Sequence, residues 1–203
     1  MTVSLVEPDE IERVTECITQ VFAADPVWSV ALARDDGRTD HLASYWRIIV
    51  EGAMLCGGVH QWNSGEAYSV WVPPDQSDLP PELEEAAQSW GVQWLSKEGA
   101  VALDELYARM EGFYDDLPTV HAYLEILATH QDHRGRGVGQ ALLAADIAEW
   151  DALGIPTCLE SSNPANNHRY LRAGYQSVGS YSAVRDDTRV TRMLRLVPGS
   201  IEP

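Results

Sequence analysis

The sequence predicts one domain of mixed α and β structure. Short apolar runs of strand length alternate with longer segments in which apolar residues recur at helical spacing. A unit with the order strand, glycine turn, helix and strand lies in the second half of the chain, and two alternating segments near the end predict a hairpin. The chain has 203 residues, enough for one sizeable core, so we expect residues 1–203 to form a single domain.

The first half predicts a strand, three helices and a pair of strands. Pro8 suits the first turn of a helix, and the Asp25-Pro26 step interrupts it because proline cannot donate a backbone hydrogen bond. Gly57-Gly58 ends the third helix. In chain order we expect a strand at 2–6, a helix from 8 to the break at 25–26, a short helix ending near 37, a helix at 40–56, and strands at 59–63 and 66–72 joined by a turn at 63–65.

The second half begins with a proline-bracketed loop and two helices, and ends with the hairpin. We expect helices at 81–95 and 98–112, a fourth strand at 121–129, a glycine turn, a helix at 137–153, a fifth strand at 157–161, a short helix at 165–173, and hairpin strands at 175–184 and 188–196.

The fourth strand has an unusual pattern. Strict alternation places four apolar side chains on one face, which we expect to be core: Ala122, Leu124, Ile126 and Ala128. The other face is polar for a central strand and carries His121, Tyr123, Glu125, Leu127 and Thr129. A polar strip on a central strand is typical of a functional site.

Composition narrows the class of protein. Lys and Arg number 14 against 31 Asp and Glu, giving a formal net charge of −17, which argues against nucleic-acid binding. The charge favours a cationic substrate or simply solubility. The three cysteines are widely spaced and form no metal-ligand pattern, so we expect no metal. No apolar run has membrane-spanning length and the N-terminus lacks signal-peptide features, so we expect a cytoplasmic protein without a membrane partner.

A glycine-rich turn precedes the helix at 137–153. Glycines let backbone N–H groups approach an anion closely, and the helix N-terminus adds unpaired donors and a positive dipole end. The turn therefore suits a diphosphate, although an ordinary glycine turn has the same local pattern. A dinucleotide fingerprint has a different spacing and an earlier position, and a P-loop needs a Gly-Lys-Ser/Thr step that is absent from the sequence.

Two segments resemble the GNAT superfamily of N-acetyltransferases. "LATHQDHRGRGVGQALL" resembles its acyl-CoA diphosphate motif, in which Arg134, Gly137 and Gly139 fill the fixed places. "ESSNPANNHRYLRAGY" resembles the next landmark of the family, and the two segments follow in the family's order. The combined stretch is similar to the puromycin N-acetyltransferase-like branch.

The resemblance implies an α+β GNAT fold, with a central mixed, mostly antiparallel, twisted sheet of six to seven strands flanked by helices. In this family a bulge splays strand four from strand five, and the pantetheine arm of acetyl-CoA lies in the gap. The Leu127 N–H would be the oxyanion donor. The implied cofactor-binding residues are Leu127, Ala128, Thr129, Arg134, Gly135, Arg136, Gly137, Val138, Gly139, Gln140, Asn163, Asn166 and Tyr170.

The same resemblance implies catalytic roles. Tyr170 matches the tyrosine that protonates the departing CoA thiolate, although an aromatic on a short helix is also a common core residue. A base must take a proton from the amine, and Glu125 is our first candidate, His121 the second and water the third. Glu125 could instead be an ion-paired residue, and His121 a structural hydrogen-bonding one.

The predicted function is transfer of acetyl from acetyl-CoA to a primary amine of a small molecule, such as an aminonucleoside or another xenobiotic, by direct attack. Trp28, Tyr45, Trp46 and Tyr123 are candidates for the acceptor pocket, although each alone is typical of a core. The alternatives are a peptide or protein N-acetyltransferase and a non-catalytic acyl-CoA-binding module. We expect a monomer or homodimer.

Overall fold

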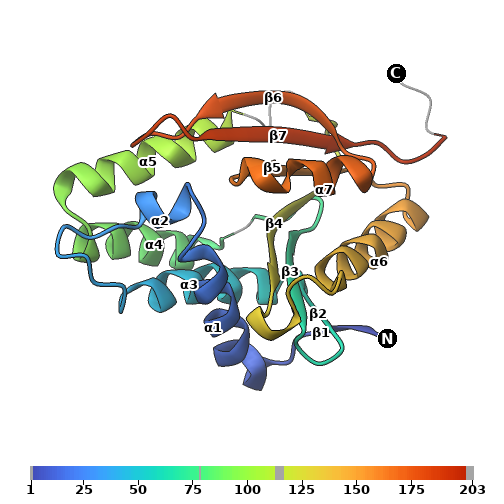
Figure 1. Cartoon of the computed structure of the whole chain (residues 1–203), viewed down its shortest axis with the longest axis horizontal. Coiled ribbons are helices and arrows are strands. Elements are labelled where there is room, and N and C mark those ends of the chain that lie inside the picture. The colour runs from blue at the N-terminus through green and yellow to red at the C-terminus, as the bar shows by residue number, and fades with distance from the viewer. Residues whose placement is uncertain (1, 78, 113–116, 200–203) are drawn as a thin grey trace.

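A twisted sheet with helices on both faces forms the framework of the protein (Figure 1). The computed structural model describes residues 2–77, 79–112 and 117–199. In this part of the chain the sheet has seven strands in the order β1-β2-β3-β4-β5-β7-β6. The strands are β1 (Val3–Leu5), β2 (Val59–Trp62), β3 (Ala67–Val72), β4 (Ala122–Thr129), β5 (Thr157–Ser161), β6 (Gln176–Ser182) and β7 (Arg189–Arg195).

The helices divide into two groups. The α-helices are α1 (Ile11–Phe22), α2 (Trp28–Ala31), α3 (Leu42–Leu55), α4 (Pro81–Trp94), α5 (Lys97–Glu111), α6 (Val138–Ala152) and α7 (Asn167–Arg172). Apolar residues of α1, α3, α4 and α5 form the largest core cluster on one face of the sheet. On the other face α6 packs across β2, β3 and β4, and Tyr170 of α7 packs against the same core cluster (Figure 1). Among the described helices, none has both the length and the apolar character needed to cross a bilayer.

The strand directions confirm the predicted fold class. β4 and β5 are parallel because α6 connects them, and the other five neighbouring pairs are antiparallel. Three predicted helices are shorter than expected: single 3-10 turns at Pro8–Glu10 and Pro164–Asn166 precede α1 and α7, and α2 is only one turn long. The other predicted elements agree within a few residues at each end.

A β-bulge lies in the middle of β4. Val70 of β3 pairs with Ile126, whereas the next residue, Trp71, pairs with Leu124. Glu125 is therefore an extra residue in β4 with no opposite partner in β3. Because side chains alternate between faces, one extra residue reverses the alternation beyond it.

The bulge changes which core the strand residues join. Leu124 packs with Trp71 in the cluster beneath α6, whereas Ile126 packs in the cluster beneath α1 and α3. The prediction that four alternate residues share one face is therefore wrong, because it assumed an unbroken strand. All four are nevertheless buried: Ala122, Leu124, Ile126 and Ala128.

β4 and β5 separate directly at the bulge. Their parallel pairing covers three residues of each strand and ends with Leu124 opposite Leu159. From Glu125 to Thr129, β4 is paired with β3 but not with β5. The predicted splay between strands four and five is thus present, and it leaves one edge of β4 open over most of its length.

A buried carboxylate fixes α6 against the sheet. Asp146 has no exposed surface and accepts hydrogen bonds from the Ser69 hydroxyl at 2.6 Å, the Trp71 indole N–H at 2.9 Å and His60 Nδ1 at 2.8 Å. These donors come from two neighbouring strands, so the helix has one register relative to them. A buried charge is tolerated because three donors replace its hydration.

Replacing Asp146 with Ala should lower the free energy of unfolding by at least about 3 kcal/mol, because three buried donors would lose their acceptor. Chemical denaturation of both proteins measures this difference. Glu149→Ala, at an exposed position of the same helix, is the matched control and should change stability little. A loss in Asp146→Ala no larger than that of the control would contradict the anchoring role.

Candidate active site

A cavity of about 840 Å³ lies where β4 and β5 diverge. Its walls come from β4, the end of β5, the glycine turn with the start of α6, the α7 segment, and the helices α1, α3 and α5. It contains most of the predicted site residues: Trp28, Tyr45, Trp46, His121, Tyr123, Glu125, Leu127, Thr129, Arg134, Gly135, Gly137, Val138, Gly139, Gln140, Asn163, Asn166 and Tyr170.

The glycine turn has a backbone that favours glycine. Gly135 and Gly137 have φ of 77° and 79°, the left-handed region that other residues rarely adopt. Gly137 is the N-cap of α6, and no side chain caps the helix there. The first N–H groups of α6 are therefore not used by a capping side chain, which suits them to bind an anion.

Gly139 has a different reason to be glycine. A Cβ at this position would lie 2.4 Å from the Thr129 hydroxyl oxygen at the end of β4. The missing side chain lets the first turn of α6 approach the open strand closely. The turn and the open edge of β4 therefore form one continuous surface.

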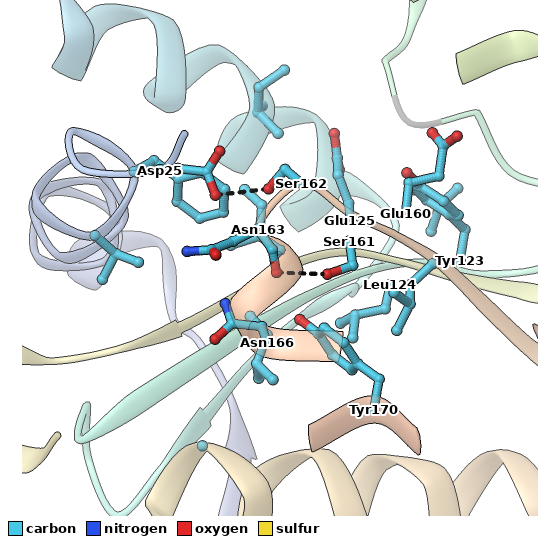
Figure 2. Close-up of a pocket in the computed structure, with 18 of the residues that line it drawn as sticks. Asp25, Tyr123, Leu124, Glu125, Glu160, Ser161, Ser162, Asn163, Asn166 and Tyr170 are labelled. Carbon is cyan, nitrogen blue, oxygen red and sulfur yellow. Dashed lines mark hydrogen bonds between the residues drawn. The ribbon is translucent and has the colours of Figure 1, made fainter. Parts of the chain in front are cut away.

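The segment after β5 is held by local hydrogen bonds. The Asn163 side chain accepts a bond from the Ala165 N–H at 3.1 Å and so caps the 3-10 turn before α7. The Ser161 hydroxyl donates to the Asn163 carbonyl at 3.2 Å (Figure 2). Asn166 is the N-cap of α7, and Tyr170, about one turn later, lies on the same side of the cavity (Figure 2).

The Tyr170 hydroxyl stays protonated over the physiological pH range. Burial raises the pKa of its hydroxyl to about 12, with a smaller contribution from Asp25 and an opposing one from Arg169. Its ring packs edge-on to Tyr175 at 6.1 Å between centroids.

The two candidate bases lie on or beside β4. Glu125 is the bulged residue and lines the cavity where β5 departs. His121 precedes the strand, and its Nδ1 is within 2.7 Å of the Pro118 carbonyl, a bond that orients the ring. In neutral imidazole a proton on Nδ1 leaves the lone pair on Nε2, so this bond suits a base as well as a structural residue.

Aromatic side chains form the wall beneath the N-terminal helices. The Trp28 ring lies 5.4 Å from Trp46, 6.1 Å from Tyr45 and 6.1 Å from Tyr107, measured between centroids. Tyr45 and Tyr107 are also joined through their hydroxyl groups. Tyr45 and Trp46 are almost completely buried, so they serve the core and the cavity wall together.

Asp25 ties the loop after α1 to the end of β5. It accepts bonds from the Val27 and Trp28 N–H groups, at 3.0 and 3.1 Å, and so caps α2. Its second oxygen accepts from the Ser162 hydroxyl at 2.7 Å (Figure 2). The link to Ser162 joins residues distant in the chain, so the local sequence pattern did not indicate it.

Glu160 is a cavity residue that sequence reasoning missed. It lies in β5 opposite Arg192 of β7, and Arg192 Nε contacts its carboxylate at 3.2 Å. The hydroxyl groups of Tyr123 and Tyr181 also lie near the carboxylate, and both lower its pKa. Burial nevertheless raises the pKa of Glu160 to about 7, because its side chain is only 2% exposed. The sequence feature that could have identified Glu160 is an acidic residue within a short, otherwise uncharged strand.

Two predicted cofactor-binding residues lie outside the cavity lining. Ala128 is buried in the core beneath α1 and α3, and Arg136 is exposed in the glycine turn. Only their backbone atoms are suited to a ligand there. In the part of the chain that the structure describes, no group of three or more His, Cys, Asp or Glu residues could hold a metal ion.

Side chains of both charges line the cavity, and the two signs come from different elements. Its carboxylates come from the α1–α2 loop, the loop after β3, α5, β4 and β5: Asp25, Asp75, Glu111, Glu125 and Glu160. Its guanidinium groups come from the glycine turn and α7: Arg134, Arg169 and Arg172. A ligand with an anionic end and a cationic reaction partner would match this division.

Comparison with known proteins agrees with this geometry. Residues 86–177 match the family model of the acetyltransferase (GNAT) domain, which spans α4 to the start of β6. The Corynebacterium glutamicum structure of "histone acetyltransferase HPA2 and related acetyltransferase" is similar at a TM-score of 0.69 and 21% identity, covering 99% of this chain and 98% of that one. The family match therefore covers the stretch that contains β4, the glycine turn, α6, β5 and α7.

Two further structures carry names of amine acetyltransferases. Arylalkylamine N-acetyltransferase 2 from Aedes aegypti has a TM-score of 0.68 at 10% identity, covering 97% of this chain and 98% of that one. An agmatine N-acetyltransferase has a TM-score of 0.63 at 13% identity, covering 96% and 98%. At these identities the structures establish the fold, which is the GNAT fold.

The raised pKa of Glu160 predicts a pH-dependent stability. In the folded protein the Glu160 carboxyl keeps its proton up to a higher pH than an ordinary glutamic acid, whose pKa is 4.5. Its contribution to stability is therefore complete below pH 4.5 and is lost as pH rises through about 7. We compare the free energy of unfolding of the unmodified protein with that of Glu160→Gln. The difference between the two should fall by about 3 kcal/mol as the pH rises from 4.5 to about 7. Denaturation at several pH values measures it, and parallel curves would contradict it.

Proposed function

We propose that the protein transfers acetyl from acetyl-CoA to a primary amine of a small molecule. One observation carries the proposal: a single cavity joins the glycine turn, the open edge of β4 and an acidic, aromatic pocket. The glycine turn and the open edge of β4 suit a diphosphate with an extended arm, and the acidic, aromatic pocket suits an amine. The GNAT fold and the family match support the same activity.

The cofactor would be held mainly by backbone groups. The N–H groups from Arg134 to Gln140 are proposed to bind the diphosphate, including those of Gly135, Arg136 and Val138. Leu127, Ala128 and Thr129 are proposed to contact the pantetheine arm along the open edge of β4. Asn163 and Asn166 would close the opposite side of the arm. The positive end of α6, a helix of 15 residues, adds attraction for the diphosphate.

Acetyl-CoA would supply an acetyl group activated as a thioester. The Leu127 N–H would stabilise negative charge on the carbonyl oxygen during attack. Glu125, or alternatively His121 or water, would take the proton that the acceptor nitrogen loses. Tyr170 would donate its proton to the departing sulfur as the carbon–sulfur bond breaks.

The acceptor is proposed to carry an aromatic group. Trp28, Tyr45, Trp46 and Tyr123 line the cavity beside the carboxylates, and aromatic faces attract both rings and cations. The neighbours named as arylalkylamine N-acetyltransferases, and the resemblance to the puromycin N-acetyltransferase-like branch, favour an arylalkylamine or an aminonucleoside.

Acetyl-CoA turnover with a panel of amines tests the proposal. The panel would contain arylalkylamines, puromycin, agmatine and peptides with a free N-terminus, and free thiol release would report transfer. Transfer to the small aromatic amines is expected. Preference for the peptides would favour a peptide N-acetyltransferase, and binding of acetyl-CoA without any turnover would favour a non-catalytic module.

The glycine turn offers a matched pair of variants. Gly137 and Gly154 lie at opposite ends of α6, both with positive φ and with no atoms within 4 Å of an added Cβ. Gly137→Ala should weaken CoA binding about 10-fold, because a strained turn misaligns at least one hydrogen-bond donor. Gly154→Ala carries the same strain and should leave CoA affinity unchanged. Calorimetric titration with CoA decides, and equal affinities in both variants would contradict the role of the turn.

Tyr170→Phe should lower kcat about 100-fold while the affinity for acetyl-CoA stays nearly constant, because only the proton donor is removed. Steady-state kinetics with the best amine, and titration with acetyl-CoA, measure the two effects. Tyr175→Phe is the matched control, since it removes a hydroxyl from the neighbouring ring outside the cavity lining. An unchanged kcat in Tyr170→Phe would remove this residue from the mechanism.

A further inference from the structure

Glu125 and Glu160 occupy corresponding positions on two strands that have just separated. Each directly follows the last pair between β4 and β5, Leu124 opposite Leu159. Figure 2 shows both carboxyl groups extending in the same direction from their strands. Both residues line the cavity, so two carboxylates flank the mouth of the splay.

Glu160 is held firmly by the strands around it. Arg192 contacts it from β7, and the hydroxyl groups of Tyr181 in β6 and Tyr123 in β4 lie near it. A carboxylate has about four acceptor positions, so the contact with Arg192 leaves capacity for a further donor. The side chain therefore has a fixed orientation and can still accept a bond from a ligand in the cavity.

Burial and a contacting arginine set the charge environment of Glu160. Arg192 is a cation in contact with Glu160, and it also donates to the Arg109 carbonyl and stacks over the Tyr181 ring at 4.9 Å. Burial raises the pKa of Glu160 by more than these contacts lower it. A second cation entering the cavity would offset the burial cost of the ionised carboxylate.

We propose that Glu160, together with Glu125, forms an ammonium-binding subsite that selects acceptors carrying a protonated primary amine. The subsite rests on the proposed function and adds a substrate class to it: alkylamines that are charged at neutral pH, in preference to uncharged nitrogen nucleophiles. Glu125 keeps its proposed role as base, and Glu160 binds the amine before it is deprotonated. The aromatic wall formed by Trp28, Tyr45 and Trp46 would hold the remainder of the acceptor.

Two amines of nearly equal shape test this selection. Phenethylamine is protonated at pH 7, whereas O-benzylhydroxylamine, in which an oxygen replaces one methylene, is uncharged. Glu160→Gln keeps the shape of the side chain and removes its charge. We expect kcat/KM to fall about 10- to 100-fold for phenethylamine, the loss of one charge-assisted hydrogen bond, and much less for O-benzylhydroxylamine. The ratio between the two amines does not depend on how much variant is folded.

Asp151→Asn is the matched control. Asp151 pairs with Arg195, also on β7, at 2.6 and 2.8 Å, and lies outside the cavity lining. Its loss should leave the ratio between the two amines at the parent value. Equal losses for both amines in Glu160→Gln would overturn the subsite and make Glu160 a structural residue.

The outcome for the parent protein separates this inference from the proposed function. If the parent acetylates other amines of the panel but neither of these two, the assigned substrate class is wrong while the activity stands. If the parent acetylates no amine at all, the proposed function itself is wrong. A parent that acetylates both, with selective loss of phenethylamine in Glu160→Gln, supports the subsite.

Discussion

The separation of β4 from β5 is the constraint on which the rest of the site depends. One extra residue, Glu125, bends β4 away after three paired positions. The sheet survives this break because β4 stays paired with β3, and β5 with β7. The cost is an unpaired strand edge inside the protein, which is tolerated where a ligand with its own amide groups can pair with it.

The helix that follows β4 places the glycine turn beside the open edge of the strand. α6 starts at the end of the open strand, and the absence of a side chain at Gly139 lets it approach Thr129 closely. Asp146, on the buried face of α6, fixes the helix on β2 and β3 through three hydrogen bonds. The stability of the α6 packing and the position of the glycine turn therefore have the same physical cause.

Local patterns in the sequence predicted much of this arrangement, while contacts between distant segments did not leave such a pattern. The helices and strands follow from apolar periodicity, and the turn follows from glycines that the backbone requires at 135 and 137. The reversal of faces within β4 was missed because residues 122–128 alternate as if the strand were regular. The family resemblance implied a bulge, but its position at Glu125 comes only from the pairing with β3. Glu160 was missed for a related reason: its environment is made by Arg192, Tyr181 and Tyr123, which come from three other strands.

A crystal structure with CoA bound tests the central claim most directly, namely that the opening between β4 and β5 receives the cofactor. The account predicts the diphosphate at the N–H groups from Arg134 to Gln140 and the pantetheine amides paired with the backbone of Leu127 and Thr129, with the sulfur near Tyr170. CoA bound elsewhere, or β4 and β5 closed into a continuous ladder beyond Leu124, would contradict it.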